Sequence, residues 1–81
     1  MKNGVEVRYF AAARAAAGAE SATCEPSTLR SILESECISN PALAHVVSQC
    51  SFLVDSVAVH DHDIFVENGS VIDVLPRFAG G

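Results

Sequence analysis

The pattern of hydrophobic and polar residues predicts one strand at the start of the chain and another near its end. Over residues 5–10 (VEVRYF) apolar and charged residues alternate, which is typical of a strand with one solvated face. Residues 71–75 (VIDVL) are mostly apolar, which suits a strand inside a sheet. The Asn68-Gly69 pair predicts a tight turn before this second strand, and Pro76 closes it.

A short helix and two further strands are predicted between these two. Residues 12–17 are rich in alanine, the best helix former, and Gly18 is suited to end the helix. Residues 20–25 (ESATCE) are compatible with a strand. Residues 52–59 (FLVDSVAV) predict another strand, broken by a tight turn at Asp55-Ser56.

The main helix is predicted from an N-cap at Ser27 or Thr28 to about Ile38. Its apolar residues fall at i, i+3, i+4 and i+8, on one face of a helix: Leu29, Ile32, Leu33 and Cys37. Glu34 and Glu36 lie off that face, so we expect both side chains to be solvated.

A second, shorter helix is predicted after Asn40, which is a suitable N-cap, with Pro41 in the first turn. Its apolar residues continue at helical spacing: Leu43, Val46, Val47 and Cys50. His45 lies between these positions, and we expect it to be a partly exposed helix residue.

The order of these elements predicts an α+β fold. Two strands, a crossover helix and further strands indicate a mixed sheet packed on one main helix, with short helices beside it. If the first and last strands are parallel neighbours, the arrangement is a β-grasp; periodicity alone does not establish that pairing. We expect residues 1–75 to form this domain and residues 76–81 to extend from it as a tail.

Composition favours a folded domain and argues against several classes of function. The 81 residues are 49% hydrophobic and 19% charged, which indicates one domain with a core rather than a disordered chain. The net charge of −5 argues against nucleic-acid binding and suits a partner with a basic docking surface. Since no apolar run approaches the roughly 20 residues of a membrane span and the N-terminus lacks a secretory pattern, we expect a cytoplasmic protein that does not bind membranes.

Cysteine and histidine offer no recognisable catalytic or metal site. Cys24, Cys37 and Cys50 form no CxxC pair, so we interpret them as small, buried or half-buried apolar residues. The His60-Asp61-His62-Asp63 segment contains metal-ligand types, but such a short local cluster favours a polar turn over a metal site. Without a recognisable catalytic set, we predict no independent enzymatic activity.

The opening and closing segments of the chain carry a resemblance to a known family. Residues 7–18 read VRYFAAARAAAG, which is a strand, then Tyr-Phe-Ala-X-X-Arg and a short helix ending near glycine. Residues 67–81 read ENGSVIDVLPRFAGG, which is a tight turn, an apolar strand, a proline and a terminal Gly-Gly. Together they resemble the MoaD/ThiS family of ubiquitin-like sulfur carriers, and most of all the small subunits of molybdopterin synthase.

The resemblance implies a ubiquitin-like β-grasp fold and a protein cosubstrate rather than an enzyme. An ATP-dependent, MoeB-like enzyme, similar to ubiquitin-activating enzyme, would adenylate the carboxyl group of Gly81, and a sulfur donor would convert it to a thiocarboxylate. The thiocarboxylate would donate sulfur in molybdenum cofactor biosynthesis, at an active site on a MoaE-like large subunit. No stably bound cofactor is expected. The alternatives are a carrier for thiamine thiazole or cysteine synthesis, a ubiquitin-like protein modifier and a non-covalent adaptor.

The candidate site is therefore the C-terminal tail. Gly81 carries the reactive carboxyl group, and Gly80 lets the tail thread a narrow channel because glycine lacks a Cβ atom. Where the family often has Pro-Pro-Val, this chain has Pro76, Arg77 and Phe78. Phe78 either anchors the tail in a partner's pocket or folds back on the domain, and Arg77 either pairs with a partner carboxylate or stays solvated. We expect the partner-binding residues to be Leu75, Pro76, Arg77, Phe78, Ala79 and Gly80.

Overall fold

Ten elements follow one another along residues 4–77, the part of the chain that this computed structural model describes. In chain order they are β1 (Val5–Tyr9), α1 (Ala11–Ala17), β2 (Ser21–Cys24), β3 (Ser27–Thr28), α2 (Leu29–Cys37), α3 (Pro41–Val47), β4 (Cys50–Val54), β5 (Val57–Val59), β6 (Phe65–Val66) and β7 (Val71–Pro76). The longest of these helices has nine residues, and none in the described ranges is long and apolar enough to cross a membrane.

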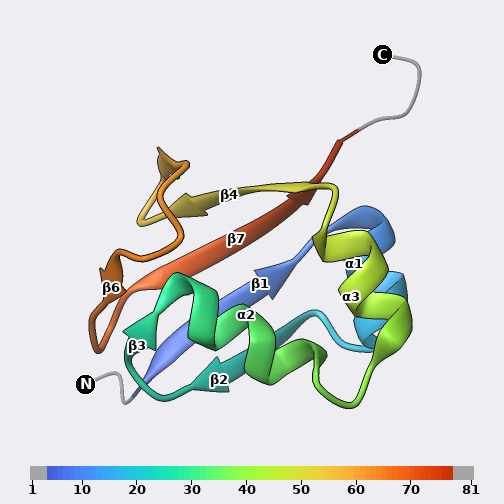
Figure 1. The fold of residues 1–81 in the computed structure, drawn as a ribbon, viewed down its shortest axis with the longest axis horizontal. Helices are drawn as coiled ribbons and strands as arrows, with labels where there is room; N and C mark the ends of the chain where they lie inside the picture. Colours follow the sequence, from blue (N-terminus) through green and yellow to red (C-terminus); the bar gives the residue numbers. More distant parts are fainter. Residues whose placement is uncertain (1–3, 78–81) are drawn as a thin grey trace.

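The main sheet has five strands in the order β2-β1-β7-β4-β5 (Figure 1). β1 and β7 run parallel at its centre, and β1–β2, β7–β4 and β4–β5 are antiparallel. The parallel pairing of the first and last strands confirms the predicted β-grasp. The short strands β3 and β6 form a separate antiparallel pair, which the sequence did not predict because two residues carry no period.

One face of the sheet carries the core. The register aligns Val7 with Ile72, Tyr9 with Val74, and Val74 with Phe52, and all five side chains are buried. The buried helix residues join the same cluster: Ala13 from α1, Leu29, Ile32 and Leu33 from α2, and Leu43 from α3. Figure 1 shows α2 crossing this face, with α1 and α3 together at the end where β1 and β7 finish. In the described part of the chain, no helix covers the opposite face of the sheet, which we call the open face.

The helix ends follow the local rules that the sequence suggested. The Thr28 hydroxyl accepts a hydrogen bond from the Ser31 N–H at 3.1 Å, and the Asn40 side chain accepts one from the Leu43 N–H at 3.0 Å. Gly18 ends α1 with φ +73°, a left-handed conformation that favours glycine. These contacts confirm the predicted starts of the two later helices and the end of the first.

The predicted break in residues 52–59 is a turn at Asp55 and Ser56, which have φ values of +50° and +70°. Aspartate tolerates this left-handed conformation. The Asp55 side chain also contacts the residues at the start of β7. The two Asp55 carboxylate oxygens accept hydrogen bonds from the Val71 N–H at 3.0 Å and the Ser70 hydroxyl at 2.8 Å. The turn is therefore held against the start of β7.

Among the predicted boundaries that were wrong, two lie next to the tail. Cys50, which continues the helical spacing of residues 43–47, begins β4 instead, and it pairs with Pro76 across the sheet. Because Pro76 pairs with Cys50, β7 extends to Pro76, one residue beyond the expected end at Leu75. Both residues gain a cross-strand neighbour that the local sequence does not reveal.

Candidate functional site

β7 is the strand that leads into the C-terminal tail. It pairs with β1 as far as Tyr9 and Val74, and with β4 as far as Cys50 and Pro76. Leu75 and Pro76 therefore have a paired neighbour on the β4 side, while β1 has already ended. Proline is tolerated at this last position because a strand end requires no further ladder donor.

Three of the expected site residues, Leu75, Pro76 and Arg77, lie at this end of the sheet. Leu75 and Pro76 are half-buried and Arg77 is exposed. Phe78, Ala79, Gly80 and Gly81 lie outside the described residues. The structure thus places Leu75–Arg77 at the rim of the sheet, at the end toward which β7 points in Figure 1.

The open face of the sheet borders this exit. The register places Leu53 opposite both Asp73 and Ala58, and Ser51 opposite Leu75, on the side away from the core. Leu53 and Leu75 are half-buried, so they present apolar surface between polar neighbours. A mixed surface of this kind, next to the last residues of β7, is suited to dock a partner protein.

An ion pair crosses the open face from β1 to β7. The Arg8 guanidinium donates from Nε to Asp73 Oδ1 at 2.6 Å and from Nη2 to Asp73 Oδ2 at 3.0 Å. Asp73 is 7% exposed, and its hydrogen bonds and charge raise the pKa of Arg8. The guanidinium carbon also lies 5.8 Å from the ring centroid of Phe10. This pair was not predicted from the sequence; its signal was the placement of Arg8 and Asp73 at outward positions of two strands.

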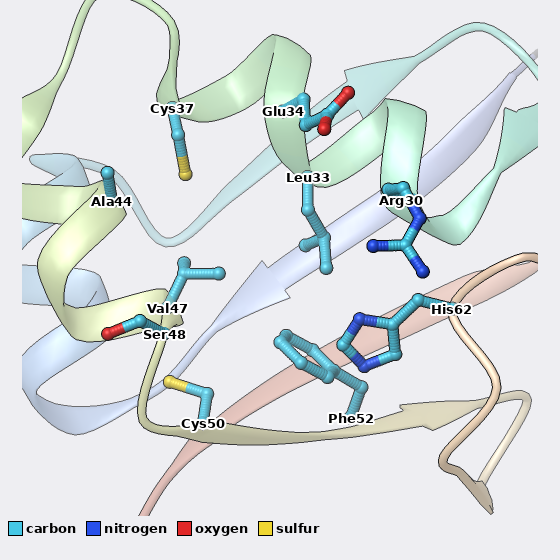
Figure 2. Close-up of a pocket in the computed structure, with 10 residues that line it drawn as sticks. All are labelled: Arg30, Leu33, Glu34, Cys37, Ala44, Val47, Ser48, Cys50, Phe52 and His62. Atoms are coloured by element: carbon cyan, nitrogen blue, oxygen red, sulfur yellow. The ribbon is translucent and has the colours of Figure 1, made fainter.

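A groove lies between α2, α3 and the start of β4, with a volume of about 340 Å³ (Figure 2). Its floor is apolar and its rim carries charged side chains. Residues from these three elements line it, with one residue between α3 and β4 and one from the loop after β5: Arg30, Leu33, Glu34, Cys37, Ala44, Val47, Ser48, Cys50, Phe52 and His62. The His62 ring meets the Phe52 ring edge-on, with centroids 5.2 Å apart and an interplanar angle of 86°.

A second pocket lies beside this groove. It shares Cys50, Phe52 and His62 with the groove, and Arg77 is part of its lining. The remaining lining comes from the β4–β5 hairpin and the residue after it: Ser51, Leu53, Ala58, Val59 and His60. That Arg77 and the two histidines His60 and His62 line one pocket was not predicted from the sequence.

The three cysteines are free and half-buried, as predicted. Burial is the main cause that raises the pKa of the Cys37 and Cys50 thiols. Burial and the Glu36 carboxylate raise the pKa of Cys24 to about 12. All three thiols therefore stay protonated near neutral pH and are poor nucleophiles.

Glu36 is half-buried and hydrogen-bonded rather than fully solvated, contrary to expectation. Its Oε1 accepts a hydrogen bond from the Tyr9 hydroxyl at 2.7 Å, and its Oε2 accepts one from the Cys24 thiol at 3.2 Å. Burial together with this contact raises the pKa of Tyr9. Helical periodicity placed Glu36 off the apolar face, but β1 and β2 reach around the helix edge and supply polar partners there.

The His60–Asp63 segment forms a turn, as predicted. The Asp61 side chain accepts a hydrogen bond from the Asp63 N–H at 2.9 Å, and Asp63 accepts one from Arg30 Nε at 2.9 Å. The Arg30 contact lowers the pKa of the Asp63 carboxyl group. Within residues 4–77, no group of three or more His, Cys, Asp or Glu side chains is arranged to hold a metal ion.

Comparison with known proteins matches residues 7–81 to the ThiS family. No curated protein matches the chain. Among solved structures, small archaeal modifier protein 1 from Methanosarcina acetivorans is similar, with 20% identity, a TM-score of 0.84 and coverage of 100% of this chain and 99% of that chain.

Two further solved structures share the fold. Small archaeal modifier protein 1 from Haloferax volcanii has 19% identity and a TM-score of 0.80, with 95% of this chain and 98% of that chain covered. The third belongs to a complex of subunits 1 and 2 of molybdopterin-converting factor from Helicobacter pylori 26695. It has 24% identity and a TM-score of 0.69, with 95% of this chain and 97% of that chain covered.

Proposed function

Because this chain belongs to the ThiS/MoaD family of ubiquitin-like sulfur carriers, we propose that it carries sulfur as a thiocarboxylate on Gly81. The observation that supports this most is the family match, which extends through the diglycine to residue 81. The paired end of β7 supports it further, because a rigid strand leads directly into the segment to be activated.

The terminal carboxyl group needs activation before it can accept sulfur. With a pKa of about 3.3–3.7, it is a carboxylate at neutral pH and a poor electrophile. A carboxylate oxygen would attack the α-phosphate of ATP and release pyrophosphate, which gives an acyl-adenylate. Hydrosulfide would then attack the acyl carbon and release AMP, leaving the thiocarboxylate.

Tail length and stiffness suit delivery into a partner's active site. Residues 76–81 span about 20 Å when extended, so the terminal carbon can enter a deep site while the domain stays outside. Pro76, held against Cys50 at the end of β7, limits the directions in which the tail leaves the sheet. Less conformational entropy is then lost on insertion.

The open sheet face is our proposed docking surface for the partner. Leu53 and Leu75 provide apolar contact beside the exit of the tail, and Arg8 is held in position by Asp73. The chain's net charge of −5 favours a partner whose rim is basic.

Within the family we propose the role of molybdopterin synthase small subunit. The chain would be a non-catalytic, cytoplasmic cosubstrate, activated by an adenylating enzyme and docked on a large catalytic subunit. The likeness to a subunit of a complex from Helicobacter pylori 26695 agrees with a two-subunit assembly. Two thiocarboxylated chains would then supply the two sulfur atoms of the product's dithiolene, one sulfur from each.

Intact-mass measurement tests the proposal directly. After incubation with a competent adenylating enzyme, ATP and sulfide, the chain should gain the mass difference between one sulfur and one oxygen atom. Deletion of Gly81 should abolish the gain and leave the melting temperature unchanged. No gain in the intact chain would reject sulfur carriage. Production of molybdopterin after addition of a large subunit and the cyclic pyranopterin precursor would support the specific role.

A protein modifier is the second candidate, because the same acyl-adenylate can acylate lysine side chains. This agrees with the similarity to small archaeal modifier proteins, although that similarity is one of fold. The modifier predicts higher-mass covalent conjugates in a cell lysate supplied with ATP. A thiazole or cysteine carrier predicts the same thiocarboxylate but no molybdopterin in the reconstituted reaction.

A further inference from the structure

The strand β2 (Ser21–Cys24) lies at one edge of the five-stranded sheet, and its outer side is open (Figure 1). Within residues 4–77 it pairs with β1 alone. An unpaired strand edge presents a row of N–H and C=O groups to which an extended segment of another chain can bind. What such a segment would meet depends on the backbone groups of β2 that point outward.

The hydrogen-bond pattern between β1 and β2 decides which groups these are. The Tyr9 N–H donates to the Glu20 carbonyl oxygen at 2.9 Å, just before β2 begins. Because bonded and non-bonded residues alternate in an antiparallel pair, the even-numbered residues of β2 continue this bonding to β1. The N–H and C=O groups of Ser21 and Thr23 therefore point away from β1, toward the open edge.

A groove with a volume of about 450 Å³ lies between this edge and α2. Hydroxyl and carboxylate groups predominate in the lining of this β2 groove: Thr23, Cys24, Glu25, Ser27, Ser31, Ile32, Ser35 and Glu36. A strand added beside β2 would direct every second side chain toward the α2 side of the sheet, because strand side chains alternate between the two faces. The β2 groove therefore provides room for side chains of the added segment.

The β2 groove is negatively charged. Glu25 and Glu36 line it, and none of the described residues in its lining is a lysine, an arginine or a histidine. Glu36 is half-buried, and its hydrogen-bond donors, the Tyr9 hydroxyl and the Cys24 thiol, are neutral groups. Among the described residues, no ion pair involves either glutamate. A partly desolvated carboxylate without a counter-charge favours the approach of a cation.

We propose that the β2 groove binds an extended segment of a partner protein, which adds as a strand beside β2 and carries a lysine or arginine. The outward N–H and C=O groups of Ser21 and Thr23 supply the main-chain hydrogen bonds. Glu25 and Glu36 select the basic side chain, because it brings the missing counter-charge to the groove. The net charge of −5 steers a basic segment toward the domain.

This site is independent of the proposed sulfur chemistry. β1 separates β2 from β7 in the sheet, and the β2 groove lies on the α2 side rather than on the open face. None of Leu75, Pro76 and Arg77 lines the groove. A protein bound at β2 would therefore leave the end of β7 accessible, so that the domain can be held by one partner while another uses its tail.

Two capped heptapeptides, TVTKVTV and TVTEVTV, test the proposal by NMR titration of the full chain. The lysine peptide should move the Ser21 and Thr23 amide protons downfield, because new hydrogen bonds form there. The Ala22 and Cys24 amides, already bonded to β1, should move less. The glutamate peptide should bind at least about tenfold more weakly, since it brings a like charge to the two carboxylates.

Three results of this titration would overturn the proposal. The first is that neither peptide binds. The second is that the two peptides bind equally well, which would remove the role of the carboxylates. The third is that the shifts map to β5, the other edge of the sheet, or to the open face instead of β2.

Substitutions at Thr23 separate main-chain from side-chain contacts. Thr23→Pro removes one outward N–H but no bond to β1, and proline is tolerated where the N–H of an edge strand faces solvent. It should weaken binding of the lysine peptide at least about fivefold. Thr23→Ala, the matched control, keeps the N–H and should bind within about twofold of the wild type. Equal affinities of these two variants would overturn the strand addition.

The charge is tested separately with Glu25→Gln. This variant should weaken binding of the lysine peptide and narrow its advantage over the glutamate peptide, and an unchanged advantage would contradict the assigned role of Glu25. Should Thr23→Pro fail to fold, the alternation of amide shifts along β2 in the wild-type chain decides by itself. Uniform shifts over residues 21–24 would then reject the added strand.

Discussion

Arg8 on β1 and Asp73 on β7, 65 residues apart along the chain, are joined by two hydrogen bonds on the open face of the sheet. The pair ties the first strand to the strand that delivers the tail. It also keeps a largely buried carboxylate satisfied beside the proposed docking surface.

Replacement of Arg8 by alanine should therefore destabilise the domain. The Asp73 carboxylate, which is 7% exposed in the wild type, would lose both charged donors, so we expect the melting temperature to fall by a few degrees. Arg14→Ala is the control, because its Nε lies 3.5 Å from the Tyr9 carbonyl oxygen and makes a weak bond. A double-mutant cycle with Asp73→Ala should show positive coupling. Equal melting temperatures for the two arginine variants would contradict the assignment.

Glu36→Ala should be clearly more destabilising than Glu34→Ala. Glu36 accepts hydrogen bonds from Tyr9 and Cys24, and Tyr9 is only 3% exposed, so an orphaned hydroxyl would remain. We expect a loss of about 1–3 kcal/mol in the free energy of unfolding. Glu34 is exposed, and its replacement should change that free energy by less than about 0.5 kcal/mol. Urea unfolding of both variants measures the difference.

Stability should decline at alkaline pH because of the same cluster. The folded state holds the Cys24 proton more tightly, with a pKa of about 12 against 9.0 for an ordinary thiol. The contribution is complete below pH 9.0, and it is lost as the pH rises toward about 12. Unfolding free energies measured from about pH 7 to about pH 11 should fall, and fall less steeply in Cys24→Ala. Parallel slopes would contradict this reading.

Gly4→Ala should destabilise the domain more than Gly69→Ala. Both glycines have left-handed φ values, +93° and +91°, so both substitutions introduce strain. At Gly4, however, a Cβ atom would also lie 2.8 Å from the Cys24 carbonyl oxygen, whereas nothing lies within 4 Å at Gly69. We expect a loss of roughly 1–2 kcal/mol at Gly69 and more at Gly4. Thermal unfolding of the two variants makes the comparison, and a smaller loss at Gly4 would count against it.

Leu75→Asp should weaken partner binding without unfolding the chain. It places a charge on half-buried apolar surface next to the tail exit, where the docking partner would have to desolvate it. Phe65→Asp on β6 is the control, since that side chain is 62% exposed on a strand outside the five-stranded sheet. Calorimetric titration with the large subunit should show at least about a tenfold loss of affinity for Leu75→Asp alone. Equal affinities of the Leu75→Asp and Phe65→Asp variants would show that the partner docks on another surface.

The sequence determined those features that depend on near neighbours. Thr28, Asn40 and Gly18 mark helix ends because a side chain or a missing Cβ atom satisfies the backbone within a few residues. Alternation identified β1, and the apolar run identified β7. The family resemblance rests on these same local segments and on the diglycine, and the match to residues 7–81 confirms it.

Only the tertiary structure decided which distant groups meet. Pairing of β1 with β7 brings Arg8 to Asp73, and pairing of β4 with β7 turns Cys50 from an expected helix residue into the strand neighbour of Pro76. Glu36 becomes half-buried because two strands pass the helix edge. The physical reason is that periodicity records which face of an element is apolar, whereas partner identity depends on contacts across the sheet that no local pattern encodes. The surroundings of Leu75, Pro76 and Arg77 belong to this second kind.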